Sequence, residues 1–485
     1  MNNKKQQVQV LLGLALMGGV MAAAPVHAGG FSTPTYGAPG WGRAFAGGSL
    51  FKNDPSSAYN NPAAMAFVEH NVAQFTVDYA RIKIKYKGSA NDYKGDPIAN
   101  IPIGDNGFPD ISAAAVNNND GGQGGFTAWL PTGFMVMPLG DRFAFGLSQV
   151  VPQGMRSTWN EDSKFRDFAV DTKIETVGLT GSLSFKVNDQ FSIGGGLIVQ
   201  HSKGFVSQNI DLFSAASLSN SPELSGVQFP SGVGGALMRV KVDNISTGWF
   251  TGVTWKPTDQ DTLGLNYHAK IKNKMTGKYN IRADAYNYAL MTQPSPIGGN
   301  GTLVEVAYPG LKLFPDGAHA STQLDIPATA GFDWVHQFND RFTLGASVVW
   351  TQWSSFKDLT LKSGDINIVS IPYNYKDTWM YSVGGDFRAT DELTLRAGVA
   401  IDQTPTRNST RDPRIPDGDR TFLSLGAGYD VKAIKGLSFD VAYSHQFVQE
   451  VKLKTKNVDR LGGASLDGKA ESSGDVVSLS ATYAF

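Results

Sequence analysis

Residues that could carry out chemistry are few in this sequence, and their spacing does not assemble a catalytic site. The chain has seven histidines, none of which forms an i, i+4 pair or lies beside a Gly-x-Ser-x-Gly motif, and it has no cysteine. Disulfides, thiolate metal sites and cysteine nucleophiles are therefore excluded. The stretch 412–419 resembles a calcium loop but lacks the closing Glu, so we interpret it as a rigid turn. We expect no enzyme activity, no cofactor and no metal.

The side chains that suggest binding are apolar and lie in one long irregular segment, 204–244. A solvated loop is usually poorer in such residues, so this apolar load is unusual for an exposed loop. The alternative is that the same side chains pack the loop onto itself as a lid. The apolar residues concerned are Phe205, Ile210, Leu212, Phe213, Leu218, Leu224, Phe229, Val233 and Leu237.

The elements that must position this segment are β-strands. From about Val72 onward, runs of roughly eight to twelve residues alternate between apolar and polar side chains and are broken by tight polar turns. Adding a first strand at 72–86 and a last strand at 473–485 to the strands joined by these turns predicts about fourteen strands, and a closed bacterial barrel has an even number. The six short turns lie at 138–141, 187–190, 257–260, 338–341, 389–392 and 432–436.

The connections on the opposite side are long, and this asymmetry is typical of outer-membrane barrels. A soluble β-sandwich would also alternate, but it would not place Trp and Tyr near strand ends, where membrane barrels carry aromatic girdles. The aromatic side chains in such places are Phe75, Tyr79, Trp249, Trp255, Trp334, Trp350, Tyr429 and Tyr443. The long connections are 87–125, 152–172, 204–244, 271–324, 352–375, 402–419 and 446–472.

Both ends of the chain support export to the outer membrane. Residues 1–28 have a basic start, an apolar stretch and a small-residue cleavage site, as a secretory signal peptide does; an N-terminal membrane anchor is the alternative. The last strand is amphipathic and ends on Phe485, which resembles the signal that the barrel-assembly machinery recognises. With 42 basic and 43 acidic residues interspersed, the chain has no electrostatic footprint for nucleic acid.

Residues 29–70 are rich in Gly, Ala, Ser and Pro and cannot form a strand. Asn61 is a suitable N-cap for a short helix with Pro62 at its first position. Because a barrel of about fourteen strands has a lumen wider than its side chains fill, we expect this segment to be a plug inside the lumen. A periplasmic tail is the alternative, and residues 71–485 would form the barrel.

Together these motifs resemble the FadL/TodX family of outer-membrane transporters for long-chain fatty acids and hydrophobic hydrocarbons. Residues 42–47, with Asn61, Pro62 and Ala63, are similar to the family's N-terminal hatch. Residues 350–356, 401–405 and 415–420 are similar to its C-terminal half in order and spacing.

The resemblance implies a monomeric fourteen-stranded barrel with a hatch, in an outer membrane of lipid and lipopolysaccharide. It implies that a fatty acid is captured in an apolar groove between two extracellular loops, passes to an inner pocket and leaves sideways through a gap beside a distorted strand. The third and fourth long connections, 204–244 and 271–324, fit this capture role. Lys203 falls where the family has a basic pocket residue, and Lys376 and Arg420 are further candidates to bind the carboxylate. For each, a salt bridge in the lumen is the alternative, with Asp402 and Asp419 as partners.

Two other functions stay open from the sequence. An uptake channel for neutral aromatic or aliphatic hydrocarbons would need no cation in its pocket. A structural or adhesive barrel, or a general porin, would need neither apolar loops nor a plug. The predicted ligand-binding residues are Lys203, Phe205, Phe213, Leu218, Phe229, Leu237, Lys376 and Arg420.

Overall fold

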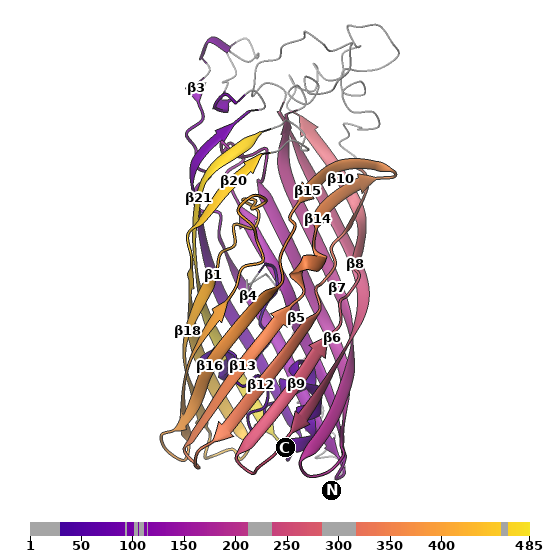
Figure 1. The fold of residues 1–485 in the computed structure, drawn as a ribbon, viewed down its shortest axis with the longest axis vertical. Coiled ribbons are helices and arrows are strands. Elements are labelled where there is room, and N and C mark those ends of the chain that lie inside the picture. The colour runs from indigo at the N-terminus through magenta and orange to yellow at the C-terminus, as the bar shows by residue number, and fades with distance from the viewer. Residues whose placement is uncertain are drawn as a thin grey trace.

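The protein forms a tall closed barrel of tilted antiparallel strands (Figure 1). The computed structural model describes residues 30–92, 95–100, 105, 111–113, 115–211, 235–283, 317–456 and 464–485, so the predicted signal peptide lies outside the described residues. The first strand, β1, pairs with the last, β21, from Val72↔Ala484 to Asn91↔Ser465, and this pairing closes the ring.

Fourteen strands complete the ring, which confirms the number predicted from the turns. Five shorter strands, β10, β11, β14, β15 and β20, continue the wall above them. In chain order the ring strands are β1 (Val72–Asn91), β4 (Phe126–Leu139), β5 (Phe143–Thr158), β6 (Asp171–Lys186), β7 (Phe191–Asp211), β8 (Gly235–Trp255), β9 (Asp261–His268), β12 (Thr329–Gln337), β13 (Phe342–Thr351), β16 (Thr378–Arg388), β17 (Leu393–Asp402), β18 (Arg420–Asp430), β19 (Leu437–Val448) and β21 (Ser465–Ala484). The upper strands are β10 (Lys274–Ala283), β11 (Ala318–Gln323), β14 (Asp358–Ser363), β15 (Ile366–Pro372) and β20 (Val451–Lys456), and β2 (Ala99–Asn100) pairs with β3 (Ala115–Val116) outside the barrel sheet.

All six predicted turns lie between paired strands, but several strands are longer than predicted. The predicted loop 204–244 is wrong at both ends, because β7 continues to Asp211 and β8 begins at Gly235. The last strand begins at Ser465 and not at Ser473.

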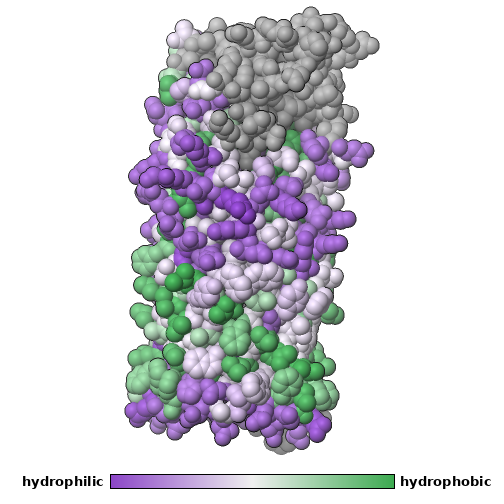
Figure 2. All heavy atoms as spheres, in the orientation of Figure 1, coloured by the Kyte–Doolittle hydropathy of each residue, from purple (hydrophilic) through white to green (hydrophobic). Residues whose placement is uncertain are grey.

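These strand ends were predicted wrongly because the apolar side chains lie on the outward face in the lower wall and on the inward face in the upper wall. In the lower wall apolar residues face outward: Leu179 is 64% exposed, whereas its neighbour Thr180 is buried at 4%. In the upper wall the pattern reverses, so that Ile82 and Ile84 are buried and Lys83 is exposed. Figure 2 shows the result, an apolar belt around the lower barrel and a polar band above it. An apolar belt is what a wall surrounded by lipid requires.

The segment before β1 lies inside the lower barrel, where its elements pack against strands from opposite sides of the ring. α2 contacts β17, β18, β19 and β21, whereas η1 contacts β4 to β8. Asn61 caps η1 as predicted, since its side chain accepts a hydrogen bond from the Ala63 N–H at 3.2 Å. None of the helices within the described residues has the length and apolar character to span a membrane. The helical elements are α2 (Ala38–Gly42), α3 (Ser57–Asn60), η1 (Pro62–Phe67), η2 (Ile111–Ala113) and η3 (Trp353–Ser355).

Candidate functional site

The Asn61-Pro62-Ala63 motif lies against glycines of the barrel wall. A Cβ atom on Gly194 would lie 2.5 Å from the Ala63 nitrogen, and one on Gly252 would overlap the Asn61 side chain. Asn61 also donates from Nδ2 to the carbonyl oxygen of Val253 at 3.3 Å. These glycines therefore allow the N-terminal segment to approach the strand backbone closely.

A network of ion pairs fixes the other half of the N-terminal segment to the wall. The Arg43 guanidinium, whose side chain is almost fully buried, contacts Asp386 on β16 at 3.1 Å and Asp54 at 3.4 Å. Arg396 on β17 joins Asp386 at 3.3 Å to Asp440 at 2.7 Å. Removing one member of a buried pair leaves an unpaired charge, so this network resists displacement of the segment.

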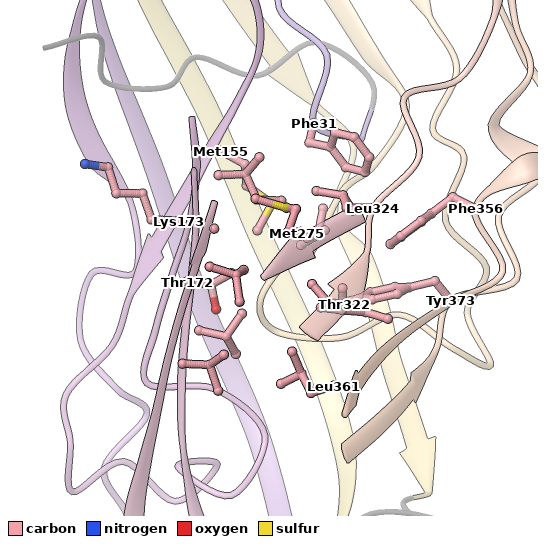
Figure 3. A pocket seen from close by; sticks show the side chains of 17 residues that line it. Phe31, Met155, Thr172, Lys173, Met275, Thr322, Leu324, Phe356, Leu361 and Tyr373 are labelled. Carbon is pink, nitrogen blue, oxygen red and sulfur yellow. The ribbon is translucent and has the colours of Figure 1, made fainter. Parts of the chain in front are cut away.

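An apolar cavity lies above the N-terminal segment and is the strongest candidate for a ligand site. Its volume is about 510 Å³, including space at its open side. Figure 3 shows side chains from the N-terminal segment, from strands on both sides and from the loops converging on it; Lys173 points away. The apolar side chains that line it are Phe31, Met155, Ile174, Val206, Val240, Val242, Met275, Leu324, Phe356, Leu359, Leu361, Tyr373 and Ile415.

The floor of this cavity is aromatic. The ring of Phe31 meets the rings of Trp353 and Phe356 edge to face, with centroids 4.7 Å and 5.5 Å apart. Trp353 also lines a larger and more polar cavity of about 1200 Å³ between the N-terminal segment and the wall. The Phe31–Trp353 contact therefore separates an apolar upper compartment from a polar lower one.

Strand β5, which lies beside these two cavities, is irregular. The β4–β5 ladder ends at Gly133↔Gln149, and the register of β5 against β6 shifts between Val150 and Gln153. In this interval the N-terminal segment replaces β4 as a partner: the Thr33 N–H donates to the Pro152 oxygen at 3.0 Å, and Ser32 bridges Gln153. The wall is thus closed here by residues 31–33 and not by a neighbouring strand.

The loop 403–419 folds inward and forms part of the cavity's boundary through Ile415. Asp412 and Arg414 are fully buried and pair at 2.7 Å. Trp159 donates from its indole N–H to the Pro413 carbonyl oxygen at 3.1 Å. Burial lowers the pKa of Arg411, and the charge of Asp417 opposes this shift. Within the described residues, no three His, Asp or Glu side chains are grouped as metal ligands.

The three predicted cations are not brought together. The Lys203 side chain is exposed on the outward-facing row of β7, so its predicted place in an inner pocket is corrected. Lys376, between β15 and β16, is exposed as well. Arg420 is buried and lines a second cavity of about 390 Å³ that shares Ile415 with the apolar one. Arg420 pairs with Asp417, which was not a predicted partner, and lies 3.9 Å from Asp402, which was.

The predicted apolar ligand residues divide into two groups. Phe205 and Leu237 lie on strands, half-buried on outward-facing rows, and so do not line the apolar cavity. Phe213, Leu218 and Phe229 lie outside the described residues, and their role stays a prediction.

The sequence interpretation missed the residues that do line the cavity. Their signal is the reversed alternation: Val240 and Val242 lie at alternate positions between the charged residues Arg239, Lys241 and Asp243 and face inward. Pro131 in β4 and Pro152 in β5 also mark the wall irregularity, because proline cannot donate to a strand ladder.

Comparison with known proteins agrees with this architecture. Residues 19–485 match the family described as outer membrane protein transport protein (OMPP1/FadL/TodX). The crystal structure of a Pseudomonas aeruginosa FadL homologue is 60% identical, covers 94% of this chain and 100% of that chain, and has a TM-score of 0.87. The long-chain fatty acid transport protein of Escherichia coli K12 is 22% identical over 87% of this chain and 89% of its own length.

The toluene transporter TbuX of Ralstonia pickettii shares the fold, with 18% identity, a TM-score of 0.61, and coverage of 93% of this chain and 98% of that chain. The family match over nearly the whole chain, the closed fourteen-stranded barrel and the apolar outer belt lead to one assignment. The chain belongs to the FadL/TodX family of outer-membrane proteins that transport hydrophobic compounds.

Proposed function

We propose that the protein takes up long-chain fatty acids and has no catalytic activity of its own. The observation that carries this proposal is the apolar cavity above the N-terminal segment. Its lining is almost entirely apolar and is drawn from the N-terminal segment, the strands and the loops, as suits a site for a hydrophobic ligand. Each methylene of an acyl chain buried there gains about 0.8 kcal/mol relative to water.

The fatty-acid substrate is supported by the relatives. The E. coli relative is named a long-chain fatty acid transport protein, and the 60% identical structure is a FadL homologue. In this proposal the ligand is captured in a groove between extracellular loops and then enters the apolar cavity.

The N-terminal segment acts as a plug in this proposal, and the exit is lateral. Movement of Phe31 away from Trp353 would join the two compartments. The larger cavity reaches Pro152 and Gln153, where β5 lacks β4 as a partner, so displacement of residues 31–33 would open the wall to the membrane. A hydrophobic ligand would leave by this path because lipid solvates it better than the periplasm does.

Neutral hydrocarbons are a second candidate substrate, favoured by one observation. Among the described residues that line the apolar cavity, the one cation is Lys173, which points away from it and pairs with Glu175 at 2.6 Å. A carboxylate would therefore have to bind at the cavity's edge, whereas toluene or an alkane needs no counter-charge.

A cavity-filling variant tests the proposed function. Val242→Trp fills the cavity from β8, and Ile245→Trp, on the outward face of the same strand and 69% exposed, is the matched control. We expect Val242→Trp to reduce oleate uptake about tenfold in an uptake-deficient host and Ile245→Trp to leave it unchanged. Heat-modifiable migration on gels checks that both variants fold.

The outcomes separate the three functions. Loss of oleate uptake in Val242→Trp supports the fatty-acid proposal. If the wild type confers toluene sensitivity but no oleate uptake, the result would favour an uptake channel for neutral hydrocarbons. No uptake of either compound by the wild type would favour a structural or adhesive barrel. Recognition of Phe485 by the assembly machinery and a monomeric state stay predictions.

A further inference from the structure

One face of the upper barrel carries a row of cations on its outer surface. Along β1, the outward-facing positions above Tyr79 are occupied by Arg81, Lys83, Lys85 and Lys87, and all four are exposed. Alternate residues of a strand are about 6.6 Å apart, so these charges form a continuous ladder along the strand.

The row begins at the upper edge of the apolar belt. Tyr79 packs against Trp129 of β4 with ring centroids 4.8 Å apart, and Trp129 is 58% exposed. Exposed Trp and Tyr mark the membrane–water interface of barrels. Arg81, the next outward position, therefore lies at the level of the lipid headgroups, and Figure 2 shows polar residues covering the wall above the belt.

The neighbouring strands add to the positive charge and do not cancel it. In register across β1, β21 and β20, Lys87 lies opposite Lys469, which lies opposite Lys452. Like charges in such positions destabilise a sheet. Around this row, seven outward cations face four carboxylates, Glu450, Asp467, Glu471 and Asp475. The outward cations are Arg81, Lys83, Lys85, Lys87, Lys452, Lys454 and Lys469.

The carboxylates that are present bind other partners. Glu471 and Glu450 pair with Lys87 at 3.7 Å and Lys469 at 2.7 Å, and Asp475 accepts from His445 and Tyr443, each at 2.7 Å. None of the ion pairs within the described residues involves Arg81, Lys83 or Lys85. Arg81 lies in register with Asp475 and Lys85 with Glu471, so these two carboxylates, which already pair with other side chains, are shared among more cations than they can neutralise.

The cations at the lower end of the barrel differ, because each has a carboxylate partner of its own. Beside the short turns, Lys186 pairs with Asp189 at 2.9 Å, Lys432 with Glu392 at 2.7 Å and Arg388 with Asp391 at 3.7 Å. The cations of the β1 row instead share their carboxylates.

We propose that Arg81, Lys83 and Lys85 bind the phosphate groups of lipopolysaccharide in the outer leaflet. Guanidinium and ammonium groups form charge-assisted hydrogen bonds with phosphate oxygens. The apolar belt below the row supplies a surface for the acyl chains of the same molecule. The site lies on the outer wall, so it is independent of the substrate that passes through the barrel.

The test compares two lipids and two triple variants of the purified full-length protein in detergent micelles. The lipids are lipid A with both phosphates and the same lipid A after enzymatic dephosphorylation. The variants are Arg81→Gln/Lys83→Gln/Lys85→Gln and the matched control Lys186→Gln/Arg388→Gln/Lys432→Gln, whose paired cations lie beside the short turns at the lower end of the barrel. Binding is measured by native mass spectrometry and by titration at two salt concentrations.

We expect the first variant to bind phosphorylated lipid A about tenfold more weakly or worse, because each cation near an anionic surface contributes about 1 kcal/mol. Its binding of dephosphorylated lipid A, its folding and its oleate uptake should match the wild type, and the control variant should lose less than about twofold. Lys83→Arg/Lys85→Arg should retain binding because it keeps the charges.

Equal losses in both triple variants, or no loss in the first, would overturn the proposal. Full competition by soluble tripolyphosphate would also overturn it, because the row would then be a site for soluble polyanions and not for a membrane lipid.

Discussion

The lower and upper halves of the barrel interior are built on opposite principles. The lower half holds residues 30–71, which are fixed by the Arg43 ion pairs and by contacts with glycines such as Gly194 and which leave a cavity beside the wall. The upper half is enclosed by apolar side chains around open space. Charged pairs depend on defined partners and geometry, whereas apolar contacts tolerate exchange of one apolar group for another. A fixed lower half and an adaptable upper half suit the uptake proposed above, in which the N-terminal segment blocks ions while the upper half admits hydrophobic ligands.

The largest effect is expected from breaking the fixed half. Arg43→Met leaves Asp54 and Asp386 without this partner, and loss of one member of a buried pair costs about 3–5 kcal/mol. We expect the barrel to fold and its conductance in planar bilayers to rise about tenfold or more. Arg388→Met, which removes an exposed pair with Asp391 at 3.7 Å, is the control and should leave conductance unchanged. A wild-type conductance in Arg43→Met would show that other contacts hold the segment.

A smaller effect is expected from placing a polar group in the adaptable half. Val240→Thr keeps the shape of the side chain but adds a hydroxyl to the apolar lining. Burying that group against an acyl chain costs about 1–3 kcal/mol, so oleate affinity should fall roughly tenfold without any ion leak. Val199→Thr, on the lipid-facing side of β7, should not change oleate binding. If conductance rises in Val240→Thr, the two halves are not independent.

An engineered disulfide can join the N-terminal segment to the wall at the boundary between the halves. The chain has no native cysteine that would compete for this bond. Ser32 bridges Gln153 in antiparallel register, so Ser32→Cys/Gln153→Cys places two thiols at a suitable separation. We expect oxidation to slow oleate uptake several-fold and reduction to restore it, if residues 31–33 move during transport. The control pair, Ser148→Cys/Thr180→Cys, joins β5 to β6 within the regular ladder. Equal uptake by the oxidised and reduced Ser32/Gln153 pair would exclude lateral exit at this place.

The smallest effect is expected at the loop above the cavity. Trp159→Phe keeps the ring contact with Phe165 but removes the hydrogen bond to the Pro413 oxygen. A neutral hydrogen bond contributes about 1 kcal/mol, so we expect an approximately twofold change in oleate uptake at most. Amide hydrogen exchange in residues 403–419 should increase in the variant. Unchanged exchange would show that the Asp412–Arg414 pair alone holds the loop.

The ring of strands was predictable from sequence because turn chemistry and alternation are local properties. The residues that line the candidate ligand site were not predictable. Alternation shows which residues share a face of a strand, but which face points into the lumen depends on whether lipid or water surrounds the wall at that height. Lys203 illustrates both points. Leu197 and Val199 are exposed on the outward face of β7, and Lys203 lies an even number of residues further along the same strand, so it faces outward as well. The Arg43–Asp386 pair joins residues 343 positions apart, and nothing in either local sequence indicates the other.

The same long separations constrain the order in which the molecule is assembled. Asn61 is 192 residues from Val253, and Ala38 is 442 residues from Ser480 on the last strand. Contacts so distant along the chain form slowly, because a long loop must close before they stabilise anything. η1 packs on β4 to β8, whose sequences follow it closely, whereas α2 packs on β17 to β19 and β21, which are made last. The two parts of the N-terminal segment therefore depend on opposite ends of the barrel sequence, and both can be seated only once β21 has closed against β1.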